Sequence, residues 1–331
     1  MTIALLNLNH LGDSLFPTPA IEALREAYPG ARLAHWMARP TTPLFAADPR
    51  FALTAERPPR ELRAWIRQAL ELRRRWRPDI VVGFCDNSLG LSLAARILGG
   101  RRRLGYRHPS TRGFFTHYTR FSPAQGHMAD SHLALVGLLG IPIPANSLSM
   151  CVAPSSLEEA RALLATNGVD RGRPLLTLSL GASRDNKKWP PDRFREVALA
   201  WQQDGGAVAL VGGPQDQPFA EQVGAGSPKR MVNGCGLRID QSAALLKLSD
   251  VTVSADTGPL HMAVAVGTPV VALFGPTDPE RTGPYHCVST VLRRMEGCPG
   301  CKLGPKAEGH TCMAALEAGE VLDAARGLLT P

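Results

Sequence analysis

The chain has 331 residues, of which 44% are hydrophobic and 20% charged, and its formal net charge is +8. This length and composition indicate an ordinary globular protein with two domains of about 150 residues each. A membrane-spanning protein is excluded, because no apolar run reaches the roughly 18 residues that a transmembrane helix needs, and the amino terminus lacks the basic start of a signal peptide, so we expect a cytoplasmic protein.

Short apolar runs and helical patterns alternate along the chain. The runs are bounded by Gly, Pro or Asp and predict buried parallel strands at 3–8, 32–37, 80–84, 175–180, 207–211, 251–254 and 270–274. The helical patterns between them cover 20–28, 61–76, 88–98, 191–203, 240–248 and 258–266. This alternation predicts an α/β fold with doubly wound sheets, whose ligands bind at the carboxyl ends of the strands.

The stretch 153–174 predicts a helix and a connector between two such sheets. We therefore expect a first domain at residues 1–160 and a second at 161–331. The positive charge belongs to the first half, since residues 1–150 contain 19 Lys and Arg against 10 Asp and Glu, whereas residues 151–331 contain 18 against 19.

Two arginine clusters carry much of this charge. The first, at 73–77, falls on a helical pattern and is typical of a solvated helix face. The second follows a Gly-Gly pair in a predicted loop, where guanidinium groups can bind a phosphorylated or carboxylated partner. It consists of Arg101, Arg102, Arg103, Arg107 and Arg112. Nucleic acid is a poor candidate, because there is no zinc-finger or RNP pattern and few aromatic residues lie among the arginines.

The stretch NHLGDSLFPTPA places Gly12 and Asp13 directly after the first predicted strand. One interpretation of Asp13 is a cap for the following helix. The pair Thr18-Pro19 already offers a capping residue followed by a proline at the first helical position, so capping alone does not require Asp13. The other interpretation is that this carboxylate does chemistry at the end of the strand.

Polar groups also follow a strand of the second half. The loop LSLGASRDNKKWPPDRF gathers Ser183, Arg184, Lys187 and Lys188 at the carboxyl end of the strand at 175–180. A strand end that presents a hydroxyl and three cations favours an anionic ligand.

The stretch VSADTGPLHMAVAV leads from a strand into a helix. Asp256, Thr257 and Gly258 precede a helix whose first turn contains a proline, and the N–H groups and positive end of such a helix favour a phosphate. Asp256 is either a plain N-cap or a functional group, and His261 is either a packed or solvent-facing helix residue or a ligand contact. No G-x-G-x-x-G follows the first strand and no G-x-x-x-x-G-K-[ST] occurs, so neither a dinucleotide-dependent dehydrogenase nor a P-loop NTPase is supported.

The seven cysteines argue against a secreted disulfide framework, because their number is odd and four of them crowd near the carboxyl terminus. Those four are Cys287, Cys298, Cys301 and Cys312. The C-x-x-C spacing of Cys298 and Cys301 suits a metal in a reducing compartment. Two interpretations remain: a loop tied by iron or zinc, and free thiols. We expect no catalytic metal.

Four stretches in this order carry a family resemblance: LGDSLFPTPAIEALREAYPGA, GASRDNKKWPPDRFREVA, VGGPQDQPFAEQV and SADTGPLHMAVAVGTPVVALFGPTDPERTGP. Together they resemble glycosyltransferase family 9, the ADP-heptose:lipopolysaccharide heptosyltransferases. The resemblance implies a GT-B architecture, with two Rossmann-like domains facing across a cleft. It places the acceptor on the amino-terminal domain and the nucleotide sugar on the carboxyl-terminal domain.

The resemblance also implies roles for single residues. Asp13 would be the general base that takes the acceptor proton in an inverting transfer, with no cofactor or catalytic metal. Lys187 would bind the donor diphosphate, with Lys188 as its alternative. Further contacts to the donor would come from Ser183, from the Thr257 and Gly258 amides, from Asp216 at the ribose, Asp256 at the sugar or its loop, and Leu237 beside the adenine. The family often has the longer Glu where Asp216 stands.

The function that follows from this resemblance is the transfer of a heptose from ADP-heptose to an anionic lipopolysaccharide core acceptor. We expect the protein at the cytoplasmic face of the inner membrane, with peripheral association possible and with Arg101 and Arg103 as contacts to the acceptor. The alternatives are a family member with a protein or another glycan as acceptor, a GT-B nucleotide-sugar epimerase, and a catalytically silent anion-binding protein. The presence of Asp13, Lys187 and Asp256 together disfavours the last.

Overall fold

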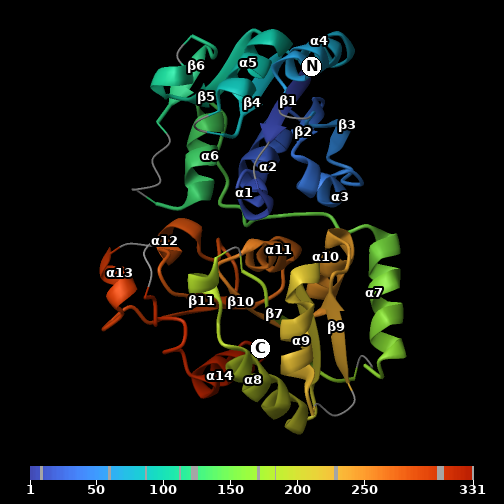
Figure 1. Ribbon diagram of the computed structural model, residues 1–331. Coiled ribbons are helices and arrows are strands. Elements are labelled where there is room, and N and C mark those ends of the chain that lie inside the picture. Colours follow the sequence, from blue (N-terminus) through green and yellow to red (C-terminus); the bar gives the residue numbers. More distant parts are fainter. Residues whose placement is uncertain are drawn as a thin grey trace. The chain divides into compact units, whose positions relative to one another are not determined.

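The computed structural model describes the chain except for residues 8–9, 59–60, 86–87, 112, 121–125, 170–171, 183, 227–229, 304–308 and 330–331 (Figure 1). The chain divides into two compact units, Met1–Cys151 and Val152–Pro331. The expected boundary between residues 160 and 161 falls inside helix α7 (Pro154–Thr166), which packs against α10 (Ile239–Leu248). An ion pair of 2.8 Å joins Glu159 of α7 to Arg238, the N-cap residue of α10, and the whole of α7 belongs to the second unit.

The first unit contains a six-stranded sheet in the order β3-β2-β1-β4-β5-β6, in which every pair of neighbouring strands is parallel. Its strands are β1 (Thr2–Asn7), β2 (Arg32–Met37), β3 (Phe51–Glu56), β4 (Ile80–Gly83), β5 (Arg102–Tyr106) and β6 (His117–Thr119). Its helices are α1 (Leu11–Leu15), α2 (Thr18–Ala27), α3 (Thr42–Phe45), α4 (Leu62–Trp76), α5 (Leu89–Leu98) and α6 (Met128–Gly137).

The second unit repeats this plan with a six-stranded parallel sheet in the order β12-β11-β10-β7-β8-β9. Its strands are β7 (Leu175–Ser179), β8 (Ala207–Gly212), β9 (Met231–Cys235), β10 (Val251–Ala255), β11 (Val270–Phe274) and β12 (Ser289–Arg293). Besides α7 and α10, its helices are α8 (Pro191–Gln203), α9 (Gln217–Gly224), α11 (Gly258–Val266), α12 (Pro279–Thr282), α13 (Pro299–Leu303) and α14 (Ala318–Gly327). Short 3₁₀ segments lie at Asp185–Lys187 (η3) and Pro214–Asp216 (η4).

Each sheet is doubly wound, as the alternating pattern predicts. Central strands such as β1, β7, β10 and β11 are buried along their whole length, because helices cover both faces of a parallel sheet. The strand order reverses between β1 and β4 in the first unit and between β7 and β10 in the second. Ligands of such sheets bind at the carboxyl ends of the strands beside this reversal.

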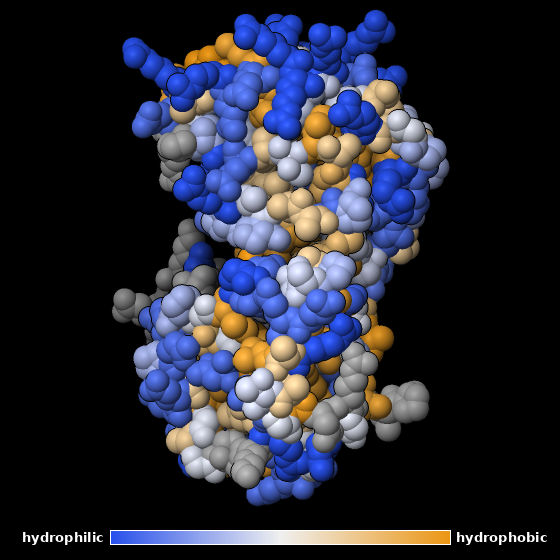
Figure 2. Space-filling view, turned by 90° about the vertical axis from the view of Figure 1, so that its right-hand side faces the viewer, coloured by the Kyte–Doolittle hydropathy of each residue, from blue (hydrophilic) through white to orange (hydrophobic). Residues whose placement is uncertain are grey.

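The surface of the molecule is largely hydrophilic on the face that Figure 2 shows, with smaller apolar areas between the polar ones. Among the helices of the described residues, none is both long and apolar enough to cross a membrane.

Candidate active site

An ion pair joins two loops at the strand reversal of the second unit. Lys187 follows β7, and its Nζ lies 2.7 Å from Oδ2 of Asp256, which follows β10, and 3.2 Å from the Asp256 carbonyl oxygen. The two side chains are 14% and 7% exposed. Because β7 and β10 are neighbours, their carboxyl ends bring a lysine and an aspartate from distant parts of the sequence together.

Asp256 is held in its charged form. Burial by itself would raise the pKa of this carboxyl, but the interaction with the nearby His261 imidazole and the charge and hydrogen bond of Lys187 outweigh it and hold the pKa far below its usual range. The Nε2 atom of His261 lies 3.7 Å from Asp256 Oδ1, on the other side of the carboxylate. Asp256 therefore acts as a fixed negative charge that orients two basic groups.

The amino end of α11 borders this pair. Thr257 is the N-cap residue in extended conformation and makes no side-chain capping bond; its hydroxyl donates to the Ala255 carbonyl oxygen at 3.3 Å instead. The N-cap interpretation of Asp256 is therefore wrong, because its carboxylate faces Lys187 and His261. The N–H groups at Gly258 and beyond, with the positive end of a nine-residue helix, lie beside Lys187 and form a suitable place for a diphosphate.

The structure separates the two lysines that the sequence leaves interchangeable. Lys187 points to the buried Asp256, whereas Lys188 pairs at 2.8 Å with Asp185, whose side chain is 95% exposed. Trp189 fixes this difference, because its indole is 1% exposed and its Nε1 donates to the Leu316 carbonyl oxygen at 3.0 Å. Lys187 is therefore the lysine that pairs with Asp256, and its contact to a donor diphosphate stays a prediction.

Asp216 is buried, and its carboxylate accepts hydrogen bonds from the turn in which it lies. Its Oδ2 accepts hydrogen bonds from the backbone N–H of Gly213 at 2.8 Å and from Gln215 Nε2 at 3.3 Å. A side chain at Gly181, after β7, would collide with the same oxygen, so a glycine is needed where the two strand ends approach. A ribose contact by Asp216 stays a prediction and would have to use its other carboxylate oxygen.

The remaining residues predicted at the donor lie on the same unit. Leu237 is half-buried and follows β9, at the carboxyl edge of the sheet. His261 is 4% exposed, so it is a packed residue that contacts Asp256 and not a solvent-facing one. Ser183 lies outside the described residues.

Asp13 lies at the strand reversal of the first unit. It is the third residue of α1, which begins after the carboxyl end of β1, and its side chain is exposed. The buried Asn7 at the end of β1 donates from Nδ2 to the Ser14 carbonyl oxygen at 2.8 Å, which holds α1 against the strand end. The N-cap residue of α1 is His10, so Asp13 is not the cap of this helix.

The capping role predicted for Thr18 is wrong. Thr18 is the first residue of α2, with Pro17 as the N-cap and Pro19 in the second position. Its hydroxyl donates to the Leu15 carbonyl oxygen at 2.7 Å and accepts the N–H of Ser149 at 3.0 Å. Thr18 therefore links α2 to the last residues of the unit.

Arg101 and Arg103 do not lie beside Asp13. They stand at the amino end of β5, and because all strands of the sheet are parallel, Asp13 lies at the opposite edge. Arg103 is also used in the fold: Nε donates to the Phe114 carbonyl oxygen at 3.0 Å and Nη1 to the Gly100 carbonyl oxygen at 2.8 Å. The predicted loop is wrong, because Arg102 and Arg103 begin a strand. A contact of Arg101 and Arg103 to the acceptor stays a prediction, and their place at the edge opposite Asp13 does not support it.

Other arginines do reach the edge that carries Asp13. Arg107 directly follows β5 and Arg120 directly follows β6, and both side chains are exposed. The backbone N–H of Arg107 donates to the Thr119 carbonyl oxygen at 2.8 Å, so the two strand ends lie together. Arg112 lies outside the described residues.

Three of the four predicted cysteine ligands come together, but Cys287 is not among them. Cys298, Cys301 and Cys312 share a cluster with His310 instead. His310 was not among the predicted ligands; it lies two residues before Cys312 in GHTCM, close enough in sequence for both side chains to reach one ion.

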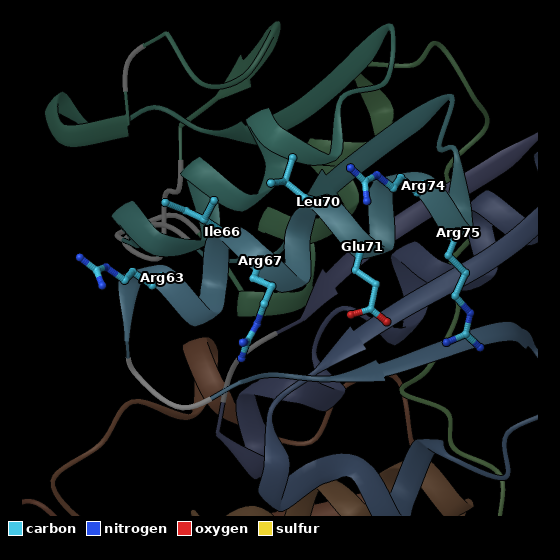
Figure 3. Close-up of a pocket in the computed structure, with 7 residues that line it drawn as sticks. All are labelled: Arg63, Ile66, Arg67, Leu70, Glu71, Arg74 and Arg75. Carbon is cyan, nitrogen blue, oxygen red and sulfur yellow. The ribbon is translucent and has the colours of Figure 1, made fainter.

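A surface hollow of about 720 Å³ lies in the first unit, along the solvent side of α4 (Figure 3). All the residues that line it come from this one helix: Arg63, Ile66, Arg67, Leu70, Glu71, Arg74 and Arg75. It is thus an open groove along a helix, and neither Asp13 nor any residue of the second unit lines it.

Comparisons with known proteins agree with this arrangement. The sequence profile of Glycosyltransferase family 9 (heptosyltransferase) matches residues 78–311. Lipopolysaccharide heptosyltransferase 3 of Escherichia coli is 25% identical over 279 residues, which are 81% of each chain. Two solved structures share the fold. The glycosyl transferase family 9 protein from Veillonella parvula DSM 2008 has a TM-score of 0.90 at 24% identity, covering 99% of this chain and 97% of that one.

The second structure is the ADP-heptose lps heptosyltransferase II of E. coli, with a TM-score of 0.84 at 22% identity, covering 99% of this chain and 98% of that one. The family profile includes the strand ends that carry Lys187, Asp216 and Asp256. A match over most of the chain, joined to two doubly wound sheets of the GT-B class, shows that this protein is a glycosyltransferase and belongs to glycosyltransferase family 9, the heptosyltransferase family.

Proposed function

We propose that the protein transfers a heptose from ADP-heptose to an anionic lipopolysaccharide core acceptor, with inversion at the anomeric carbon. The observation that carries the proposal is the Lys187–Asp256 pair, fixed at 2.7 Å beside the amino end of α11. The relatives support the donor and the acceptor class, since they are named as ADP-heptose and lipopolysaccharide heptosyltransferases.

The second unit would hold the donor. Asp256 fixes the Lys187 ammonium before the donor arrives, so little reorganisation is needed when a diphosphate binds at the end of α11. As the bond to the sugar breaks, negative charge grows on the leaving ADP. The ammonium and the N–H groups of α11 stabilise that charge more in the transition state than in the ground state.

The first unit would hold the acceptor and the base. Inversion requires that the acceptor oxygen attack from the face opposite the leaving diphosphate, while a carboxylate takes its proton. Asp13 is exposed at a strand reversal, where it can reach a bound hydroxyl. Arg107 and Arg120 at the same edge would bind phosphate or carboxylate groups of the acceptor.

The outer face of α4 would contact the membrane in which such an acceptor lies. This helix places Arg63, Arg67, Arg74 and Arg75 along one groove with Leu70, whose side chain is 42% exposed (Figure 3). A basic helix face with exposed apolar residues is typical of binding to an anionic lipid surface.

The experiment incubates the full chain with ADP-heptose and a series of core acceptors truncated by one sugar at a time. We expect ADP release that depends on one acceptor, a product heavier by one heptose, and an inverted anomeric configuration by NMR. Equal ADP release without an acceptor would indicate hydrolysis or epimerisation and would contradict the transferase proposal. Transfer only to a protein or another glycan would refute the lipopolysaccharide acceptor.

A further inference from the structure

Four potential metal ligands meet in the second unit, away from the Lys187–Asp256 pair in the sequence. They are Cys298, Cys301, His310 and Cys312, and their donor atoms all lie within 4.8 Å of one another. Cys301 Sγ is 3.4 Å from His310 Nδ1 and 3.6 Å from Cys312 Sγ. The His310 Nδ1 atom is also 3.9 Å from Cys298 Sγ and 4.0 Å from Cys312 Sγ.

These separations are those of a tetrahedron around one ion. With metal–sulfur bonds of about 2.3 Å and metal–nitrogen bonds of about 2.0 Å, the edges of a tetrahedron are roughly 3.8 Å between sulfurs and roughly 3.5 Å between sulfur and nitrogen. Four of the six edges are 3.4–4.0 Å, and the other two, from Cys298 Sγ to the sulfurs of Cys301 and Cys312, are no longer than 4.8 Å. A single ion therefore fits between the four atoms once the ligands move slightly inward.

The backbone around the cluster supports this arrangement. Cys298 stands directly before α13, and its sulfur accepts the backbone N–H of Thr311 at 3.2 Å. The N–H of Gly300 donates to the Gly309 carbonyl oxygen at 3.2 Å, so the two ligand-bearing segments are also joined to each other. An N–H that points to a cysteine sulfur favours the thiolate form, which is the form that binds metals.

The cluster is closed to solvent on the side of the core. Cys298 and Cys312 are each 1% exposed and belong to the hydrophobic core of the unit. A site with four protein ligands and no open position is typical of a structural metal and not of a catalytic one.

A disulfide explains this cluster less well. It would use two of the three sulfurs and would leave the third and the histidine without a purpose. The chain's other cysteines, Cys85, Cys151, Cys235 and Cys287, belong to no such group of ligands among the described residues. The histidine is thus the feature that distinguishes a metal site from a chance meeting of thiols.

We propose that Cys298, Cys301, His310 and Cys312 bind one structural zinc ion. Three thiolates and one imidazole in a tetrahedron match the ligand preference of Zn²⁺, with iron as the other metal that takes such a set. The ion joins the segment that carries Cys298 and Cys301 to the segment that carries His310 and Cys312, and fixes both to the core. This site is independent of the proposed donor and acceptor.

The position of the loop gives the metal a consequence for the fold. A Cβ atom at Gly275, directly after β11, would lie 2.8 Å from Cys312 Sγ and 2.9 Å from Met313 Sδ, so the cysteine loop packs against this strand end. The carboxyl end of β11 neighbours that of β10, which leads to Asp256. Loss of the ion would loosen the loop that supports this edge.

The test measures the metal content of the full chain, purified without chelators, by inductively coupled plasma mass spectrometry. We expect about one zinc per chain in the wild type and in Cys287→Ser, a matched cysteine outside the cluster, and less than a tenth of that in Cys301→Ser. Cys301 is the least buried of the three cysteines, so its replacement by serine disturbs the core least.

Two further measurements use the wild-type chain alone, so they do not depend on whether a variant folds. A thiol-modifying mercurial should release one zinc per chain, and reconstitution with Co²⁺ should give the thiolate charge-transfer and d–d bands of tetrahedral cobalt. One iron per chain, lost in Cys301→Ser, would overturn zinc as the ion. Two results would overturn the site. One is a wild-type chain that stays metal-free after anaerobic reconstitution with Zn²⁺. The other is a Cys301→Ser variant that loses no more metal than Cys287→Ser.

Discussion

Lys187 and Lys188 are adjacent in sequence but differ in surroundings, which gives the donor site a matched pair of variants. Lys187→Ala removes a cation that contacts the diphosphate before and during the reaction, so both the affinity for ADP and kcat should fall. Lys188→Ala removes a half-exposed cation paired with the exposed Asp185 and should change neither. Calorimetric titration with ADP measures the affinity, and initial rates measure kcat. Equal losses in both variants would contradict the proposed role of Lys187 at the diphosphate.

Asp13 can be tested by a change that keeps its shape. Asp13→Asn removes basicity, so kcat should fall by about 10²–10⁴-fold, which is the usual contribution of general base catalysis. The Kd for ADP should remain the same, and so should the Tm, because the side chain is exposed. Asp185→Asn is the control, because Asp185 is also an exposed carboxylate in a short helical segment. This variant should retain full activity. Near-normal turnover of Asp13→Asn would leave this carboxylate without a catalytic role.

The buried charge of Asp256 ties stability to pH. Its pKa in the folded protein lies below the ordinary value of 3.8, so its contribution is fully present above that pH and is lost as the pH falls below it. Replacing it with Asn leaves Lys187 unpaired and should cost roughly 3–5 kcal/mol of unfolding free energy at pH 7. Urea unfolding of both proteins should show this difference as constant from pH 8 to 5 and shrinking towards pH 3. A difference that grows in acid would contradict the depressed pKa.

At the scale of elements, the edge on which an arginine lies decides whether it can meet the acceptor. Arg107 at the carboxyl end of β5 and Arg102 at its amino end are both exposed arginines of the same strand region. Arg107→Ala should raise the KM for the acceptor roughly ten-fold, since a hydrogen bond to a charged group is worth about 1.5–3 kcal/mol, and should leave the KM for the donor unchanged. Arg102→Ala should change neither. An effect of Arg102→Ala equal to that of Arg107→Ala would contradict the assignment of the acceptor to the carboxyl edge.

The sequence predicts the central elements better than the edge elements, for physical reasons. Strands β1, β7 and β11 are buried on both faces and therefore appear as continuous apolar runs. Strand β5 begins with two arginines and lies near an edge, so its pattern is hidden by charge, and the same charge led to its interpretation as a ligand loop. Strand β6 has three residues and is too short to produce a pattern.

The candidate donor site also has parts that the sequence predicts and parts that it does not. The loops that carry Lys187 and Asp256 can be predicted, because each follows a strand and precedes a helix. Their direct contact cannot, because it depends on β7 and β10 being neighbours, which the order of strands in the sequence does not give. His310 was missed for another reason, since a histidine beside a cysteine is informative only when its partners in space are known.

At the scale of the whole molecule, the charge is divided between the two units. The first 150 residues have nine more basic than acidic side chains, 19 against 10, and the remainder has one fewer, 18 against 19. If α4 contacts an anionic membrane, Arg67→Ala with Arg74→Ala should weaken binding to phosphatidylglycerol vesicles about thirty-fold, at about 1 kcal/mol for each charge. Arg161→Ala with Lys247→Ala removes two exposed charges from the second unit and should have little effect. Flotation with vesicles measures both; equal losses would attribute binding to net charge alone.

The hydrogen bond from Trp189 Nε1 to the Leu316 carbonyl oxygen spans 127 positions of the sequence. During synthesis the lysine loop leaves the ribosome long before its anchor does. Contacts of such long range form late, because the intervening chain must be ordered first. The loop that carries Lys187 can take its anchored position only after Leu316 has been made, so this part of the candidate site forms late in the synthesis of the second unit.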